Sequence, residues 1–320
     1  MLPSSAHPIV DAFTASLKNE AGTNTKSGKV KRSSNLQKVS QVLGWRNRFS
    51  QSEYYPIELS LPGANVDMSK SEAEIVVSFQ VKQFQRGEVE NTYGTGATVW
   101  PASLVLLKYL EHIVSTGRIT KKKNMVIGDL GSGTGVTSIA AALLFPDSVV
   151  ICTDGCDPVV ELAKENCSKC IVKKRSRTNE NEFSLPSENY NDIGRYRIGT
   201  SSIRVSKYWW GDGTILNELR KHDNTATEAS FDILLISDCV LPKLYPIEPL
   251  IDALDECMTA STIAIVTFEY RYFPKYDPKT FFFDLASKRG FHVRQVPLEE
   301  QHSIYSVDDI EVWEIRKKDL

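Results

Sequence analysis

A glycine-dense turn that carries an acid is the stretch of this chain best suited to chemistry. Residues 128–135 read GDLGSGTG and follow a short apolar run at 125–127. Glycines let a backbone turn sharply at the end of a strand and leave no side chain between it and a ligand. A helical pattern at 136–145 and an apolar run at 149–152 come next, and the run closes at Asp154. The stretch predicts a strand–loop–helix–strand unit whose loop faces a nucleotide-like ligand; a turn without a ligand is the alternative.

The spacing of the glycines and the position of the acid indicate which of two nucleotide-like ligands the loop would bind. A dinucleotide-binding turn follows the pattern G-x-G-x-x-G, whereas this chain has Gly131, Gly133 and Gly135, and the next residue is Val136. Asp129 lies two residues before Gly131, where a carboxylate repels a pyrophosphate but accepts hydrogen bonds from an ammonium group. The pattern therefore favours S-adenosylmethionine, which carries an amino acid end and a sulfonium in place of phosphates, over a nicotinamide dinucleotide.

The ends of two predicted strands supply further candidate residues. Asp154 ends the second strand, where an acid is placed to hold ribose hydroxyls, and Gly155 and Cys156 follow it at the expected border of the adenine. The most apolar run, residues 231–237, is typical of a central strand in a parallel sheet. It ends at Ser237, at the carboxyl edge where doubly wound sheets bind their ligands.

Composition narrows the class of protein. The 320 residues are 41% hydrophobic, which is enough for a sizeable core, and the net charge of −2 provides no general attraction for nucleic acid. No apolar run reaches about 18 residues, so we expect no membrane span. Cys167 and Cys170 form the only C-x-x-C pair, and a zinc site would need further ligands; we expect no metal and reduced thiols in a cytoplasmic protein. The basic residues Lys29, Lys31 and Arg32 leave a nuclear address as an alternative.

The pattern along the chain predicts three segments. Residues 1–35 are polar and basic, and we expect a flexible N-terminal segment. Residues 36–92 combine a helical stretch with two partly alternating runs, which predict a β-extension. Residues 93–320 alternate apolar strands with helices, apart from the polar stretch 169–202, which we expect to be an inserted loop. The fold predicted is α/β: a Rossmann-like, doubly wound, seven-stranded sheet with an antiparallel C-terminal finish and an N-terminal β-extension.

Four further stretches carry a resemblance to a known family. They are TGATVWPA at 95–102, WGD at 210–212 after a strand, DCVL at 238–241 after the most apolar strand, and the tail at 296–310. With the glycine-rich loop, they resemble the seven-strand, S-adenosylmethionine-dependent methyltransferases that modify lysines of non-histone proteins such as chaperones and translation factors. The tail is similar to the branch that contains the valosin-containing-protein lysine methyltransferase. The resemblance covers residues 53–318.

The resemblance implies roles for individual residues. Trp100 would cover the cofactor or its entry and Trp210 would flank the adenine; for both, a place in the core is the alternative. Asp238 would be the catalytic residue that orients the arriving lysine ammonium. The expected cofactor-binding residues are then Trp100, Asp129, Gly131, Ser132, Gly133, Thr134, Gly135, Asp154, Gly155, Cys156, Trp210, Gly211 and Ser237.

The chain departs from the family pattern at one informative position. Leu241 stands where the family carries the tyrosine of its D-x-x-Y motif, and Tyr245 is a partial substitute. Glu269, Tyr270 and Arg271 end the next strand, where they either shape the target channel or form a structural salt bridge. The expected partner is a lysine-bearing protein that meets a monomeric enzyme, without nucleic acid or membrane. The alternatives are another acceptor, namely protein histidine, a small molecule or RNA, or a cofactor-binding scaffold without catalysis.

Overall fold

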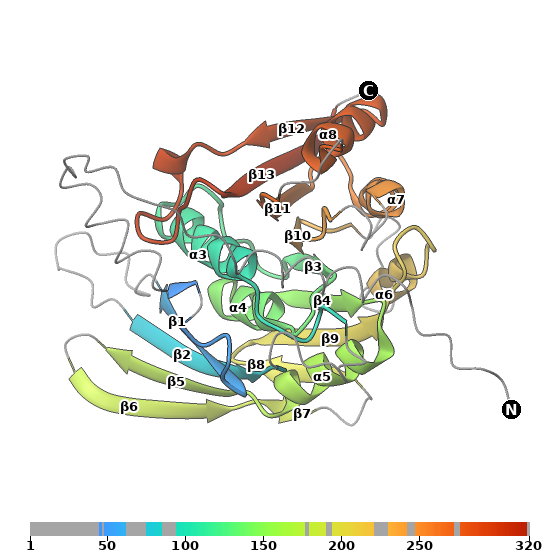
Figure 1. The fold of residues 1–320 in the computed structure, drawn as a ribbon. Coiled ribbons are helices and arrows are strands. Elements are labelled where there is room, and N and C mark those ends of the chain that lie inside the picture. Colours follow the sequence, from blue (N-terminus) through green and yellow to red (C-terminus); the bar gives the residue numbers. More distant parts are fainter. Residues whose placement is uncertain are drawn as a thin grey trace, which may run out of the picture.

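The computed structural model describes residues 45–46, 48–61, 75–84, 94–176, 179–189, 194–220, 230–241, 247–271 and 276–318. These residues form two β-sheets and the helices that cover them (Figure 1). Residues 1–44 lie outside the described residues; they include the predicted flexible segment 1–35 and most of the helical stretch that we predict at 36–49. Tyr245 also lies outside the described residues. None of the described helices is long and apolar enough to cross a membrane.

The larger sheet confirms the predicted doubly wound arrangement. Its five central strands are parallel, and β13 pairs antiparallel with both β11 and β12, which is the predicted antiparallel finish. Two short antiparallel strands, β8 and β7, extend the predicted seven strands to nine. The strand order is β12 (Phe291–Gln295), β13 (Ile310–Lys317), β11 (Ile263–Glu269), β10 (Ile233–Ser237), β3 (Val126–Leu130), β4 (Val149–Asp154), β9 (Ser201–Lys207), β8 (Arg195–Ile198) and β7 (Glu188–Asn189).

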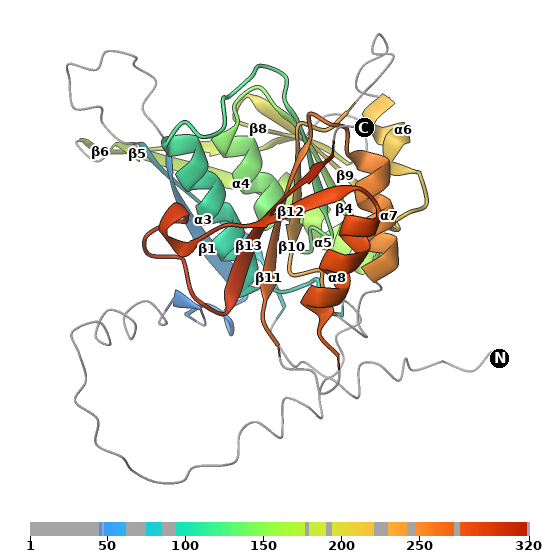
Figure 2. The same cartoon turned by 90° about the horizontal axis from the view of Figure 1, so that it is seen from above.

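Helices cover both faces of this sheet, because successive side chains of its strands point to opposite sides. In β10, Ile233 and Leu235 join one apolar cluster, whereas Leu234 and Ile236 join the other. Figure 2 shows the two helical layers on either side of the strands. The first layer contains α3 (Pro101–Ser115), α4 (Val136–Leu144) and α5 (Asp157–Ser168); the second contains α6 (Ile215–Arg220), α7 (Ile247–Cys257) and α8 (Pro278–Lys288).

The order of the strands reverses at β3, which lies between β4 and β10. In doubly wound sheets a ligand binds in the crevice outside the carboxyl ends of the strands at this reversal. The glycine-rich turn follows β3 directly, and Ser237 ends β10. The topology therefore brings the glycine-rich turn, the end of β4 and the end of β10 to one edge.

The smaller sheet is antiparallel and consists of β1 (Tyr54–Leu61), β2 (Ile75–Lys82), β5 (Ile171–Ser176) and β6 (Asn179–Pro186). Tyr55, Ile57 and Leu59 alternate with exposed residues along β1 and share the apolar cluster of α3 and α4 (Figure 1). The predicted N-terminal β-extension is thus present, and it provides two of the four strands.

The prediction of a loop at 169–202 is wrong for the described part of that stretch. It forms β5 to β8, and β5 pairs with β2 of the N-terminal extension. The strands of this stretch carry few apolar residues, so their sequences lack the alternation of apolar and polar residues that reveals a half-buried strand. In β5, Val172 is buried, whereas Ile171, Lys173 and Arg175 are exposed.

Candidate functional site

Three glycines of the loop after β3 have left-handed backbone conformations, with φ of 72° at Gly131, 57° at Gly133 and 78° at Gly135. A Cβ atom at Gly133 would lie 2.6 Å from the carbonyl oxygen of Gly96, and one at Gly131 would lie 2.8 Å from the Sγ of Cys239. Only glycine fits at these two positions. The loop is therefore in close contact with the turn at 94–100 on one side and with the end of β10 on the other.

Hydrogen bonds fix the loop to the end of β4. The backbone N–H of Ser132 donates to the carbonyl oxygen of Thr153 at 2.8 Å, and the Thr153 hydroxyl donates to the carbonyl of Asp129 at 2.9 Å. The N–H of Gly135 donates to the carbonyl of Ser132 at 2.9 Å. The Cys152 thiol donates to the Ser132 hydroxyl at 3.1 Å. These bonds hold the predicted cofactor loop in one conformation before any ligand arrives.

Asp129 is completely buried beneath this loop. Its Oδ2 atom accepts hydrogen bonds from the hydroxyls of Thr137 at 2.5 Å and Ser138 at 2.6 Å, at the start of α4. Burial raises the pKa of Asp129 to about 6, although the two hydroxyl hydrogen bonds oppose the increase. Its Oδ1 atom has no partner among the described residues. This oxygen can therefore accept a further hydrogen bond, and the ammonium of an amino acid end is a donor that fits it.

Asp154 ends β4 and is partly buried. Its Oδ2 accepts the backbone N–H of Gly133 at 3.1 Å, and its Oδ1 accepts the N–H of Cys156 at 3.0 Å. Burial raises the pKa of this carboxyl, and the backbone amides of Cys156, Gly133 and Gly155 oppose the increase. Each carboxylate oxygen can accept a second hydrogen bond, so the side chain is oriented with capacity left for two ribose hydroxyls.

Two neighbouring tryptophans border the loop from the end of β9. The ring of Trp210 lies 3.3 Å from the position that a Cβ of Gly131 would take, and the ring of Trp209 lies 3.2 Å from the same position at Gly155. Trp209, which is 61% exposed, was not among the predicted site residues. The doublet of tryptophans after a strand was the available signal. A Cβ atom at Gly211, in contrast, would lie 3.1 Å from the Cβ of Asp252 in α7, and the predicted cofactor contact of Gly211 stays a prediction.

The turn at 94–100 leads into α3 and forms another wall of the site. The indole N–H of Trp100 donates to the carbonyl of Thr95 at 2.8 Å, which fixes the ring against its own turn. Trp100 precedes Pro101, the first residue of α3, as expected for a proline in a first helical turn. Two hydroxyls join α3 to β10, since the Oγ atoms of Ser103 and Ser237 lie 2.9 Å apart.

Asp238 follows β10 in a left-handed conformation, with φ of 56°, and its side chain is 4% exposed. Both oxygens of its carboxylate accept hydrogen bonds from the guanidinium of Arg271, at 2.8 and 2.6 Å. The backbone N–H of Glu269 also donates to Oδ1, at 3.3 Å. Asp238 thus lies at the carboxyl edge of the sheet, as predicted, but its carboxylate is paired with Arg271 of the same chain.

Arg271 connects Asp238 to a larger set of charges. Its Nη2 lies 3.1 Å from Oε2 of Glu269, and its guanidinium carbon lies 5.8 Å from the centre of the Trp100 ring. Of the two predictions for this stretch, the structure contains the salt bridge. Leu241, in place of the family tyrosine, is 7% exposed and belongs to the core. The role of Arg271 was not predicted from the sequence, because a single charge after a strand has no distinguishing pattern.

The cysteine pair offers no chemistry of its own. Cys167 and Cys170 are buried, free thiols at the end of α5, and burial raises the pKa of Cys170 to about 12. Within the ranges that the structure describes, no group of histidine, cysteine, aspartate and glutamate residues is placed to hold a metal ion.

Comparison with known proteins gives one family match. Residues 80–183 match a family described as lysine methyltransferase. The chain is also similar to the release factor glutamine methyltransferase of Neisseria gonorrhoeae (strain ATCC 700825 / FA 1090), with 32% identity over 80 residues. That alignment spans 25% of this chain and 29% of the curated relative.

Two solved structures show a more distant likeness. A precorrin-6y C5,15-methyltransferase from Geobacter metallireducens GS-15 aligns with a TM-score of 0.40 and 13% identity, over 71% of this chain and 92% of that one. Trm1 from Pyrococcus horikoshii, in a complex with S-adenosyl-L-methionine, aligns with a TM-score of 0.40 and 17% identity, over 69% of this chain and 57% of that one. Residues 80–183, about a third of the chain, are thus similar to the lysine methyltransferase family, and the doubly wound topology of the sheet agrees with that likeness.

Proposed function

We propose that the protein transfers a methyl group from S-adenosylmethionine to the side-chain nitrogen of a lysine in another protein. The observation that supports this most directly is the contact between the glycine-rich loop and the end of β10. Gly131 touches Cys239, and the preceding residue, Asp238, carries a carboxylate that lies next to Glu269. Acids at the ends of β10 and β11, next to the residue that touches the cofactor loop, suit an acceptor that arrives as a cation. The family match supports lysine as the acceptor class.

The cofactor would be held by groups that are already oriented. The free oxygen of Asp129 would accept the ammonium of its amino acid end, and Asp154 would accept its ribose hydroxyls. Trp209 and Trp210 would border the adenine, together with Gly155. S-adenosylmethionine, when bound, supplies a methyl carbon that its sulfonium has activated for displacement.

The protein contributes orientation and removal of water from the acceptor. A lysine must lose its proton before it can attack, and solvent accepts that proton. Asp238 would orient the arriving ammonium, but Arg271 occupies both of its oxygens in the structure. The acceptor therefore has to share Asp238 with Arg271 or displace it. Leu241 lacks the hydroxyl that the family pattern would place nearby, so we assign the contact with the acceptor to the acids of this edge, Asp238 and Glu269.

The direct test is incubation of the protein with S-adenosylmethionine tritiated in its methyl group and a cell extract. We expect a labelled band on a gel that protease removes and RNase leaves, with methyl-lysine in its hydrolysate. An Asp154→Ala variant run in parallel, at a cofactor concentration below saturation, should give much less label. Label in RNA, in a small molecule or on protein histidine would reject lysine as the acceptor.

The ion pair between Asp238 and Arg271 favours a second candidate function, a cofactor-binding scaffold without catalysis. Both oxygens of the Asp238 carboxylate accept hydrogen bonds from an arginine of the same chain. Asp238 therefore has a structural role that needs no substrate. This candidate predicts that calorimetry detects cofactor binding while no extract yields a labelled product. A labelled product of any kind excludes it.

A further inference from the structure

Arg46 belongs to the segment before the methyltransferase domain, 223 positions from Glu269 in the sequence, yet the two side chains touch. Its Nη2 atom lies 2.6 Å from Oε1 of Glu269, and its Nη1 lies 2.6 Å from Oδ2 of Asp309. The Arg46 and Glu269 side chains are only 13% and 18% exposed, whereas that of Asp309 is 50% exposed. The contact with Glu269 is therefore the better shielded of the two.

Glu269 has one carboxylate oxygen for each of two arginines. Its Oε1 pairs with Arg46, and its Oε2 lies 3.1 Å from Nη2 of Arg271. The same Arg271 donates to both oxygens of Asp238. A continuous series of hydrogen-bonded charges thus runs from Arg46 to Asp238, the residue before the Cys239 that touches the cofactor loop.

We propose that Arg46 is a positioning residue for the acceptor site, through Glu269 and Arg271. While Arg46 holds Oε1 of Glu269, the carboxylate presents its Oε2 to Arg271, and Arg271 stays bidentate on Asp238. Without Arg46, both oxygens of Glu269 can pair with Arg271 in a fork geometry that competes with Asp238. Asp238 would then lose its fixed orientation. The inference rests on the proposed function, because Asp238 is its acceptor-orienting group.

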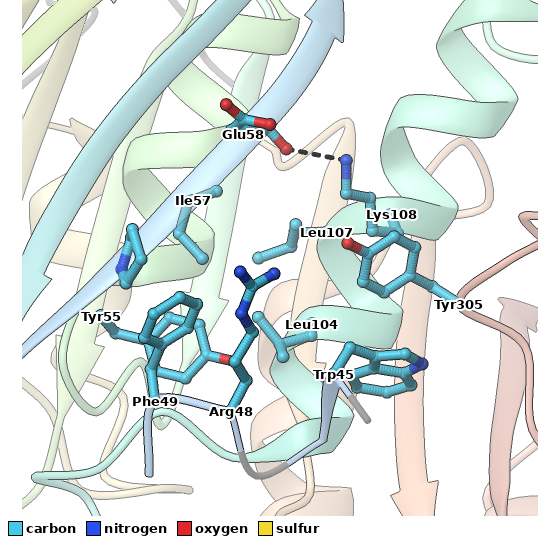
Figure 3. A pocket seen from close by; sticks show the side chains of 11 residues that line it. Trp45, Arg48, Phe49, Tyr55, Ile57, Glu58, Leu104, Leu107, Lys108 and Tyr305 are labelled. Carbon is cyan, nitrogen blue, oxygen red and sulfur yellow. Dashed lines mark hydrogen bonds between the residues drawn. The ribbon is translucent and has the colours of Figure 1, made fainter. Parts of the chain in front are cut away.

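Residues close to Arg46 in the sequence, Trp45 and Phe49, are packed against other parts of the chain. The Trp45 ring centre lies 5.2 Å from that of Tyr305, and the Phe49 ring centre lies 5.5 Å from that of Tyr55. The side chain of Gln83 donates to the Phe49 carbonyl at 2.7 Å. Figure 3 shows Trp45, Phe49 and Tyr305 around a small pocket that Leu104 and Leu107 of α3 also line. These contacts anchor the backbone on either side of Arg46, so its guanidinium is presented to Glu269 with little freedom.

The test compares Arg46→Ala and Arg46→Lys with Asp309→Asn in the full chain. Asp309→Asn removes the exposed partner of Arg46 and leaves the Glu269 contact in place. We expect Arg46→Ala to lower kcat for the methyl acceptor by about ten-fold, because small misplacements of a positioning group are costly, with the Kd for S-adenosylmethionine changed less than about two-fold. Arg46→Lys, which keeps one charged contact, should restore part of kcat, and Asp309→Asn should behave like the wild type.

Equal kcat values for Arg46→Ala and Asp309→Asn would overturn the proposal, as would a loss of kcat matched by an equal loss of cofactor affinity. Hydrogen exchange of the peptide that contains residues 268–271 tests the same idea without activity. Its amides should exchange faster in Arg46→Ala than in Asp309→Asn, and equal rates would overturn the proposal. A wild-type protein that methylates no lysine rejects the proposed function alone, because the exchange experiment still decides the role of Arg46.

Discussion

At the scale of single residues, the two aspartates of the predicted cofactor site differ in the hydrogen-bond partners of their carboxylate oxygens. Asp154 has a backbone amide on each oxygen, so its orientation is fixed and its remaining capacity faces the predicted ribose. Asp129 has one oxygen saturated by Thr137 and Ser138 and the other unpaired in the interior. The first is prepared for neutral hydroxyls and the second for a charged donor, and the following two predictions test these roles.

Asp154→Ala should weaken the binding of S-adenosylmethionine by about ten-fold or more, because hydrogen bonds to a charged group contribute about 1.5–3 kcal/mol. Isothermal titration calorimetry measures the effect. Asp157→Asn is the matched control: it lies three residues later on the exposed start of α5, where it pairs with Lys207. Unchanged affinity in Asp154→Ala would remove the ribose assignment.

Cofactor affinity should depend on pH through Asp129. Its pKa of about 6 in the protein without ligand means that much of it is protonated below pH 6. A bound ammonium favours the ionised form, so binding lowers this pKa and releases protons. Affinity should therefore rise as the pH increases from about 5 to 7.5, and Asp129→Asn should flatten the profile as well as weaken binding. Calorimetry in buffers of different ionisation enthalpy counts the protons; a flat wild-type profile would contradict the assignment.

At the scale of elements, the cofactor loop is defined by its contacts with other turns. Gly133 touches the carbonyl of Gly96, and Gly131 touches Cys239 after β10. The loop after β3 thus contacts both the turn at 94–100 and the end of β10, which are far apart in the sequence. Its glycines are required by left-handed backbone angles and, independently, by neighbours that leave no room for a side chain.

Gly133→Ala separates these two requirements when it is compared with Gly199→Ala. Both glycines have positive φ, 57° and 62°, but a Cβ at Gly199 would meet nothing within 4 Å. Gly199→Ala should cost only the left-handed strain of about 1–2 kcal/mol in unfolding free energy and leave cofactor affinity intact. Gly133→Ala should in addition push the two turns apart and weaken cofactor binding by at least about ten-fold. Similar affinities in the two variants would show that the close contact is unimportant.

At the scale of the whole molecule, the N-terminal extension and the α/β domain contribute strands to one common sheet. The pairing of β2 with β5 builds one sheet from residues before and within the domain. Asn166 of α5 joins the two parts, because its amide exchanges two hydrogen bonds with the backbone of Lys82 and donates to the carbonyl of Thr134. The expected monomer, the cytoplasmic location and the lack of a nucleic acid partner stay predictions.

Asn166→Ala should lower the free energy of unfolding by about 2–3 kcal/mol, since it leaves the buried carbonyl of Thr134 and partly buried backbone groups of Lys82 without this partner. Urea denaturation followed by circular dichroism measures this value. Lys169→Ala, three residues later, removes an exposed ion pair with Glu165 and should change stability by less than about 0.5 kcal/mol. An Asn166→Ala variant as stable as Lys169→Ala would show that the two parts are joined elsewhere.

The sequence by itself determined the elements whose signals are local. The glycine-rich turn, the apolar strands around it and the helix that begins at Pro101 each follow from spacing within a few residues, so their positions and the doubly wound sheet were predictable. The cofactor class followed from Asp129 and the glycine spacing for the same reason.

Only the tertiary structure decided the partners of the charged groups and the fate of the polar stretch at 169–202. Arg46 reaches Glu269, and Arg271 occupies Asp238, through contacts between segments that the chain order does not bring together. An ion pair across such distances leaves no periodic signal in the sequence, because a charged side chain looks the same whether it faces solvent or a partner. Part of the stretch at 169–202 forms strands because the backbone of β5 pairs with the edge of β2. Such pairing uses backbone hydrogen bonds, so a polar sequence can form it as well as an apolar one.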